Sequence, residues 1–83
     1  MPHNLTVEVL DSKGNPKQHV EVEIIIEGFW KGGSIEAFTD DSGHAEFETA
    51  DDYESSRKLH IRVRGQSFGP YRIGSGSYTV QLE

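Results

Sequence analysis

Hydrophobic and polar residues alternate along most of this 83-residue chain. In residues 5–9 and 20–26, every second residue is apolar, and those between are mainly threonine, glutamate or isoleucine. Successive side chains of a β-strand point to opposite faces of a sheet, so this alternation predicts strands with one buried and one solvated face. The pattern recurs in residues 35–39, 44–49, 58–64 and 78–82, and a seventh strand is expected near "PYRI", residues 70–73.

Turn-forming residues separate these segments. The stretches "DSKGNP" (residues 11–16) and "DDSG" (40–43) are rich in Asp, Asn, Gly and Pro. These residues favour tight turns, so each stretch is expected to close a hairpin of two antiparallel neighbours. Residues 49–58 have enough helical character for a turn or a loop only. The glycine-rich stretch 64–77 is the longest irregular piece.

Short alternating strands at regular spacing favour two small sheets packed face to face. We therefore expect an all-β fold, a small antiparallel β-sandwich of about seven strands, with an open barrel as the structural alternative. A chain of 83 residues is long enough for one small core, so residues 1–83 are expected to form a single domain.

Composition narrows the possible functions. The chain contains no cysteine, which excludes disulfides and thiolate zinc sites. Its longest aliphatic run is Ile24–Ile26, so we expect no signal peptide and no transmembrane segment, and a cytoplasmic location by default.

Charge is unevenly distributed within the formal total of −6. Residues 1–54 carry a net charge of −10, and residues 55–83 carry +4. We expect the late basic strand to lie near the early acidic strands and to relieve their repulsion. Nucleic-acid binding is not expected, because it needs a net positive surface.

Three stretches carry a resemblance to a known family. They are "VEVLDSKGNPKQHVEVEI" (residues 7–24), "AFTDDSGHAEFE" (37–48) and "LHIRVRG" (59–65). The order of strand, Asp-x-x-Gly-x-Pro, strand, Thr-Asp-x-x-Gly and strand resembles the transthyretin-like (prealbumin-like) β-sandwich of the carboxypeptidase regulatory-like domains. Bacterial immunoglobulin-like (Ig-like) modules share much of it. The resemblance implies a non-catalytic module.

Enzymes of the same fold can be tested residue by residue. The hydroxyisourate hydrolases carry a histidine in the first strand and end in Tyr-Arg-Gly-Ser, whereas this first strand has valine and glutamate and the chain ends "YTVQLE". Collagen-adhesin domains form a lysine to asparagine isopeptide, for which residues 5–9 offer no lysine and residues 78–82 no asparagine or aspartate. We therefore assign no catalytic residue.

The remaining polar residues suggest ordinary surface roles. His3, His19, His44 and His60 form no close metal-binding motif, so no metal and no cofactor are expected.

Glu46 and Glu48 lie two apart on one strand. We expect them to form a solvated stripe opposite Arg62 and Arg64 rather than an acid and base pair. No set of serine, histidine and acid has a recognisable spacing.

The stretch "GFWKGG", residues 28–33, is the best functional lead. Phe29 falls in phase with Ile25, on the solvent face of its strand, and Phe38 is likewise out of phase with its buried neighbours. Trp30 falls in phase with the buried set, where it would cover the end of the core or join an exposed patch. The candidate binding residues are Ile25, Phe29, Trp30, Phe38, Phe68 and Tyr71.

These observations predict a binding or scaffolding module without catalysis. Its partner would be another protein or a second copy of the chain, bound through the aromatic outer face of the second hairpin and the glycine-rich loop. One alternative is carbohydrate binding, with Phe29, Trp30 and Tyr71 stacking on sugar rings. A small transthyretin-related hydrolase is the other.

Overall fold

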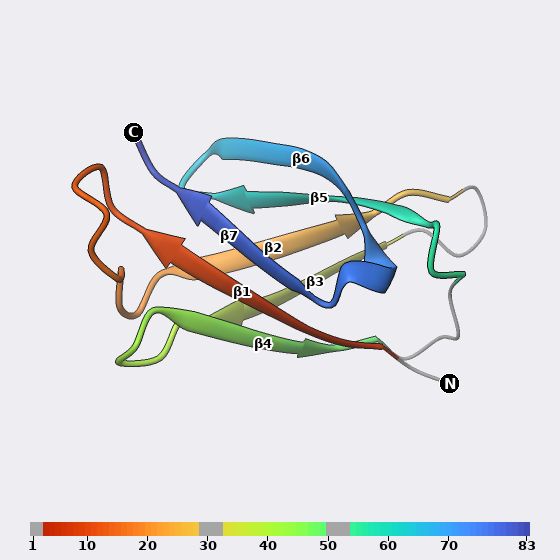
Figure 1. Cartoon of the computed structure of the whole chain (residues 1–83), viewed down its shortest axis with the longest axis horizontal. Helices are drawn as coiled ribbons and strands as arrows, with labels where there is room; N and C mark the ends of the chain where they lie inside the picture. Colours follow the sequence, from red (N-terminus) through yellow and green to blue (C-terminus); the bar gives the residue numbers. More distant parts are fainter. Residues whose placement is uncertain (1–2, 29–32, 50–53) are drawn as a thin grey trace.

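A computed structural model of the chain describes residues 3–28, 33–49 and 54–83. In these residues the chain forms seven β-strands and one turn of 3-10 helix, η1 (Figure 1). The strands are β1 (Asn4–Leu10), β2 (Glu21–Ile26), β3 (Gly33–Phe38), β4 (His44–Glu48), β5 (Lys58–Val63), β6 (Gln66–Arg72) and β7 (Ser77–Gln81), and η1 is Ile73–Ser75. The expected all-β class and strand number are confirmed.

The strands form two sheets, one of three strands in the order β4-β1-β7 and one of four in the order β3-β2-β5-β6. Along β1, β2 and β5 every second side chain is buried, as the alternation predicts. These inward side chains pack between the sheets as one core. The chain is therefore a small β-sandwich, whose core includes Leu5, Val7, Val9, Val22, Ile24, Leu59, Ile61, Val63, Ile73 and Val80.

The strand order differs from that of an immunoglobulin domain. In the constant-type Ig fold, strands one, two, four and five form one sheet, and strands three, six and seven form the other. Here the second, third, fifth and sixth strands share a sheet. In addition, β7 runs parallel to β1, so the expectation of a purely antiparallel sandwich is wrong at this pair. Strands β2 to β6 separate β1 from β7 in sequence, and this long connection lets β7 return in the same direction as β1.

The turns at residues 11–16 and 40–43 do not close hairpins within a sheet, contrary to expectation. Each of them carries the chain from one sheet to the other, from β1 to β2 and from β3 to β4. The paired hairpins are β2–β3 and β5–β6. Turn chemistry reverses the chain, but it does not decide whether the next strand bonds to the last one or packs over it.

Aspartate side chains build both of these turns. The Oδ1 atom of Asp11 accepts hydrogen bonds from the backbone N–H groups of Lys13 and Asn15, each at 2.9 Å. In the second turn, Oδ1 of Asp40 accepts the backbone N–H groups of Ser42 at 2.9 Å and His44 at 3.1 Å. Both turns are Asx turns, in which the side chain takes the place of a backbone acceptor.

The two turns also pack against each other at one end of the sandwich. Gly43 has a φ of +82°, and a Cβ atom there would lie 2.8 Å from the Cβ atom of Pro16. The buried Thr39 hydroxyl donates to the Lys17 carbonyl at 2.8 Å and accepts the Val20 N–H at 3.0 Å. The residues that carry the family resemblance thus fix the architecture of this end.

The helical expectation for residues 49–58 is met only by a turn where the structure describes it. The Arg57 N–H donates to the Glu54 carbonyl at 2.9 Å, and residues 50–53 lie outside the described part. The 3-10 turn η1 was not expected. The described residues contain no helix long and apolar enough to cross a membrane.

Candidate functional site

The outward face of the β2–β3 hairpin carries two of the candidate binding residues. Phe38 lies opposite Glu21, and Ile25 lies opposite Ser34, so both side chains project away from the core. The pair Glu23 and Glu36 lies between them along the strands, so Ile25 and Phe38 occupy opposite ends of the hairpin. Phe29 and Trp30 lie outside the described residues.

Phe38 is the most exposed large apolar side chain in the described part of the chain, with 64% of its surface accessible. Ile25 is half-buried, and its cross-strand neighbours are Ser34 and His60. Isolated apolar residues on a protein surface are common, so the residues around Phe38 decide whether it marks a contact surface.

A charged depression lies beside Phe38 on the same face. It has a volume of about 270 Å³ and is lined by Glu21, Glu23, Arg62, Arg64 and Gly65. Arg62 on β5 faces Glu23 on β2, and their Nε and Oε1 atoms are 3.4 Å apart. The basic strand therefore does lie next to an acidic strand, as the charge distribution predicts.

The turn between β5 and β6 positions Arg64 at the edge of this depression. Val63 pairs with Gln66, which leaves a loop of two residues, Arg64 and Gly65. Their φ angles of +52° and +81° are those of a type I′ hairpin turn. We call Phe38, Glu21, Glu23, Arg62 and Arg64 the Phe38 surface.

The other two aromatic candidates lie on the inward side of the four-stranded sheet. Phe68 and Tyr71 on β6 are partly buried and pack against the core. The Tyr71 ring contacts the ring of Tyr78 on β7, with centroids 5.4 Å apart. The Tyr78 hydroxyl donates to the Arg72 carbonyl, and burial raises the pKa of this hydroxyl above its ordinary value. Phe68 and Tyr71 therefore do not extend the Phe38 surface.

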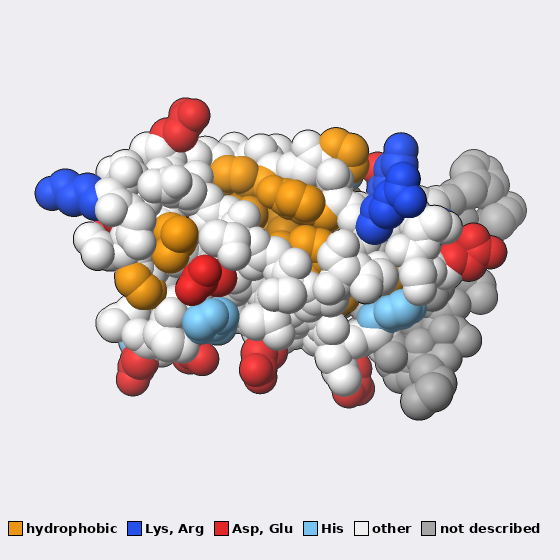
Figure 2. Space-filling model, viewed as in Figure 1, with side chains coloured by type: hydrophobic (Ala, Val, Ile, Leu, Met, Phe, Trp, Pro, Cys, Tyr) orange, Lys and Arg blue, Asp and Glu red, His pale blue; other side chains and the backbone are white. Residues whose placement is uncertain are grey.

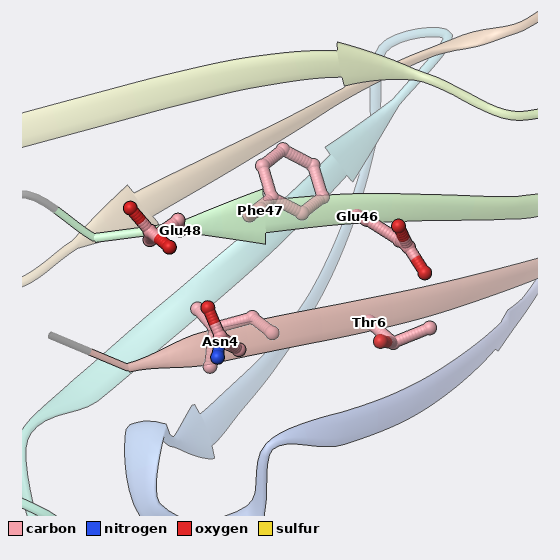
Figure 3. Close-up of a pocket in the computed structure, with 6 residues that line it drawn as sticks. Asn4, Thr6, Glu46, Phe47 and Glu48 are labelled. Atoms are coloured by element: carbon pink, nitrogen blue, oxygen red, sulfur yellow. The ribbon is translucent and has the colours of Figure 1, made fainter.

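A second depression, of about 450 Å³, lies over β1 and β4. Figure 3 shows Glu46 and Glu48 of β4 beside Thr6 and Asn4 of β1, whereas Phe47 projects away from them. These glutamates face outward from the three-stranded sheet and Arg62 faces outward from the other, so the expected stripe opposite Arg62 and Arg64 is wrong. Among the described residues that line the depression there is no histidine, cysteine or serine to form a catalytic set with these glutamates.

One cluster was missed by the sequence reasoning. Ser42 Oγ lies 2.9 Å from His44 Nδ1, and His44 Nε2 lies 3.6 Å from Glu8 Oε2 on the neighbouring strand. The order of groups is that of a serine triad. However, the Ser42 hydroxyl also lies 2.7 Å from Asp40 Oδ1, and a carboxylate is the stronger acceptor of its proton. The hydroxyl is thus held as part of the turn instead of being activated by the imidazole.

The histidines on the sheet faces and turns each contact a different carboxylate. The shortest N to O distances are 3.1 Å for His19 and Asp41 and 3.0 Å for His60 and Glu27. In the part of the chain that the structure describes, no group of three His, Cys, Asp or Glu residues is arranged to hold a metal ion.

Comparison with models of known protein families gives no match, and a search of curated proteins gives none.

Proposed function

We propose that this protein is a non-catalytic binding module of the transthyretin-like type, which contacts a protein partner through the Phe38 surface. The observation that carries the proposal is the 64% exposure of Phe38 beside a depression lined by two arginines and two glutamates. Aromatic residues and arginine are the types most enriched at the centres of protein interfaces.

The residues that carry the resemblance to transthyretin-like domains have structural roles, and these roles support this type of module. Asp11, Asp40, Gly43 and Thr39 build the turns that join the two sheets at one end. Because these residues stabilise turns, their pattern predicts a fold rather than a reaction. The specificity of such a module depends on the side chains of its outer surface.

A protein partner fits the Phe38 surface better than a sugar does. Carbohydrate stacking needs several ring faces on one surface, but the Tyr71 ring lies on the other side of the sheet and packs on Tyr78. Conversely, Arg62 and Arg64 suit acidic groups of a partner, and Glu21 and Glu23 suit basic ones.

Site-specific photocrosslinking tests this proposal. A photoreactive amino acid replaces Phe38 in one sample and Glu48 in another, since both are exposed but on opposite sheets. Each protein is irradiated in an extract of the cells that make it. We expect a discrete adduct from position 38 that is absent from position 48.

Competition then shows whether the contact is specific. Excess unlabelled protein should abolish the adduct, excess Glu48→Ser should do the same, and excess Phe38→Ser should not. Identical adducts from both positions, or equal competition by Phe38→Ser, would contradict a contact centred on Phe38.

A further inference from the structure

The two sheets have four edge strands, and three of them carry features that discourage pairing with another strand. Strand β4 presents Glu46 and Glu48, β3 presents Glu36, and β6 contains Pro70 and a register irregularity where it pairs with β5. Charges, prolines and bulges are the usual protection of exposed edges. Strand β7, "SYTVQ", has no charged residue, no proline and a regular register with β1.

The backbone of β7 leaves alternate residues without ladder partners. Thr6 N–H donates to the Gly76 carbonyl, and Leu82 N–H donates to the Leu10 carbonyl, so the even-numbered residues of this segment face β1. The backbone groups of Ser77, Thr79 and Gln81 therefore point away from β1. No described strand pairs with that edge, which offers a donor and an acceptor at each of the three residues.

An apolar opening lies beside this edge. Figure 2 shows hydrophobic side chains gathered between β6 and β7. The inward side chains of β5 are fully buried, whereas Phe68 and Tyr71 on β6 are only partly buried. The difference arises because the four-stranded sheet extends beyond β7, so that no described strand lies opposite β6 (Figure 1). Two contacts join β6 to the segment that contains β7. The rings of Tyr71 and Tyr78 are in contact, and the Glu83 N–H donates to Gln66 Oε1 at 3.1 Å.

We propose that the free edge of β7 binds one extended segment of a partner protein, which adds a fourth strand to the three-stranded sheet and covers the apolar opening. Strand addition supplies affinity through backbone hydrogen bonds and specificity through alternate side chains. The inward side chains of the segment would lie next to Tyr78 and Val80 and over Phe68, so they should be apolar.

Charge restricts the outward side chains of the segment. Those of β7 are Ser77, Thr79 and Gln81, and the next strands of the same face carry Glu8, Glu46 and Glu48. On a chain of net charge −6, a segment with lysine and no acidic residue fits this face best.

A whole second copy of the sandwich does not fit as the occupant. Antiparallel pairing of two β7 edges would place both four-stranded sheets on the same side of the joined sheet, since two such strands are related by an axis perpendicular to it. Each β6, which lies beyond β7 in its own molecule, would then extend over the partner's β7, where the partner already has its own four-stranded sheet (Figure 1). A single extended segment brings no second sheet with it and avoids this overlap, so the edge selects an isolated segment.

Amide hydrogen exchange, read residue by residue by NMR, tests this proposal on the whole chain. The probe is the synthetic peptide acetyl-KTVTVTVK-amide, in which valine occupies alternate positions. We expect it to slow exchange of the Ser77, Thr79 and Gln81 amides at least tenfold at saturation. The amides of Glu46 and Glu48, on the opposite edge of the same sheet, should be unaffected. A peptide of the same composition without alternation, acetyl-KTTTVVVK-amide, is the matched control.

Two proline variants locate the contact. The Thr79 N–H points away from β1, so Thr79→Pro should keep the β1–β7 ladder but abolish protection by the peptide. Glu46→Pro makes the same change on β4, where the N–H also points away from β1, and should leave peptide binding intact. Thermal unfolding checks that both variants fold, and the wild-type exchange pattern is informative even where one does not.

Each other outcome overturns the proposal. Equal protection at β4, no protection at β7, or binding that survives in folded Thr79→Pro would exclude the β7 edge. Protection that appears on concentrating the protein without peptide would show that a second copy occupies it. Loss of peptide binding in Phe38→Ser would move the contact to the Phe38 surface, whereas failure of the crosslinking experiment alone would leave the β7 edge untouched.

Discussion

At the scale of single residues, Asp40 organises the connection between the two sheets. Its carboxylate accepts the Ser42 hydroxyl and the backbone N–H groups of Ser42 and His44. These hydrogen bonds, that of the Ser42 hydroxyl first, hold the pKa of Asp40 below its ordinary value of 3.8. Asp11 has a lowered pKa for the same kind of reason, led by its bond from the Asn15 N–H.

This shift predicts how acid affects the turn. A carboxyl with a lowered folded-state pKa stabilises the fold above its unfolded-state pKa, and the contribution is lost as pH falls through the folded-state value. Asp40→Asn keeps the Oδ1 acceptor but cannot ionise. We expect it to be less stable than wild type near pH 7, and to approach wild type as the pH falls below 3.8 and through the lowered folded-state pKa of Asp40.

Urea unfolding at a series of pH values measures this difference. Asp41→Asn is the control, because the structure gives the Asp41 carboxylate no backbone N–H bond among the described residues. A gap between Asp40→Asn and wild type that stays constant down to about pH 2 would show that the charge of Asp40 does not matter.

At the scale of secondary-structure elements, the turn of the β5–β6 hairpin contains an arginine that suits the proposed contact but is unfavourable for the stability of the turn. Its type I′ turn holds Arg64 at a φ of +52°, a conformation that asparagine tolerates better than arginine. Asn-Gly is the favoured sequence for such a turn, yet Arg64 lines the charged depression beside Phe38. An arginine in this place suits a contact role more than a turn role.

Replacing Arg64 should separate the two roles. Arg64→Asn is expected to raise the free energy of unfolding by about 0.5–1 kcal/mol, and to reduce the yield of the adduct at position 38. Gly65→Ala, at a φ of +81°, should lower stability by about 1–2 kcal/mol. Chemical denaturation gives both values, and an Arg64→Asn protein that is less stable than wild type would refute the turn argument.

At the scale of the whole molecule, the sandwich has one closed side and one open side. Strands β3 and β4 are joined through Thr39 to Gly43 and pack together, whereas β6 and β7 leave apolar side chains visible between them (Figure 2). The Tyr71 and Tyr78 rings make contact across this opening. Tilted aromatic pairs at such distances contribute beyond their buried area.

A double-mutant cycle measures that contact. With leucine at positions 71 and 78, singly and together, we expect a coupling free energy of about 0.5–1.5 kcal/mol. Phe47 lies on β4, at the other edge of the three-stranded sheet, so the cycle of Tyr71→Leu with Phe47→Leu should give a coupling near zero. Equal couplings in the two cycles would mean that the ring contact has no special role in joining the sheets.

Of the candidate site, the sequence predicted the direction of two side chains and little of their surroundings. The phase of Ile25 and Phe38 within their strands placed both on the outward face. Phe68 and Tyr71 lie in the glycine-rich stretch, where a register irregularity interrupts the alternation, so their inward direction was not readable. Phe29 and Trp30 stay predictions, because they lie outside the described residues.

The alternation and the turn residues in the sequence predicted every strand except the extent of β6, the buried face of those strands, and the positions of the turns. The reason is local: an apolar residue at every second position has only one face to bury, and Asp and Gly at fixed offsets shape a turn without distant help. Tertiary structure alone decided the neighbours, placing β7 parallel to β1, Arg62 beside Glu23 and no described strand beside β7. Alternation with a period of two specifies which face of a strand is buried, but not which strand lies along each of its edges. The neighbouring strands depend on how the two sheets pack over one core.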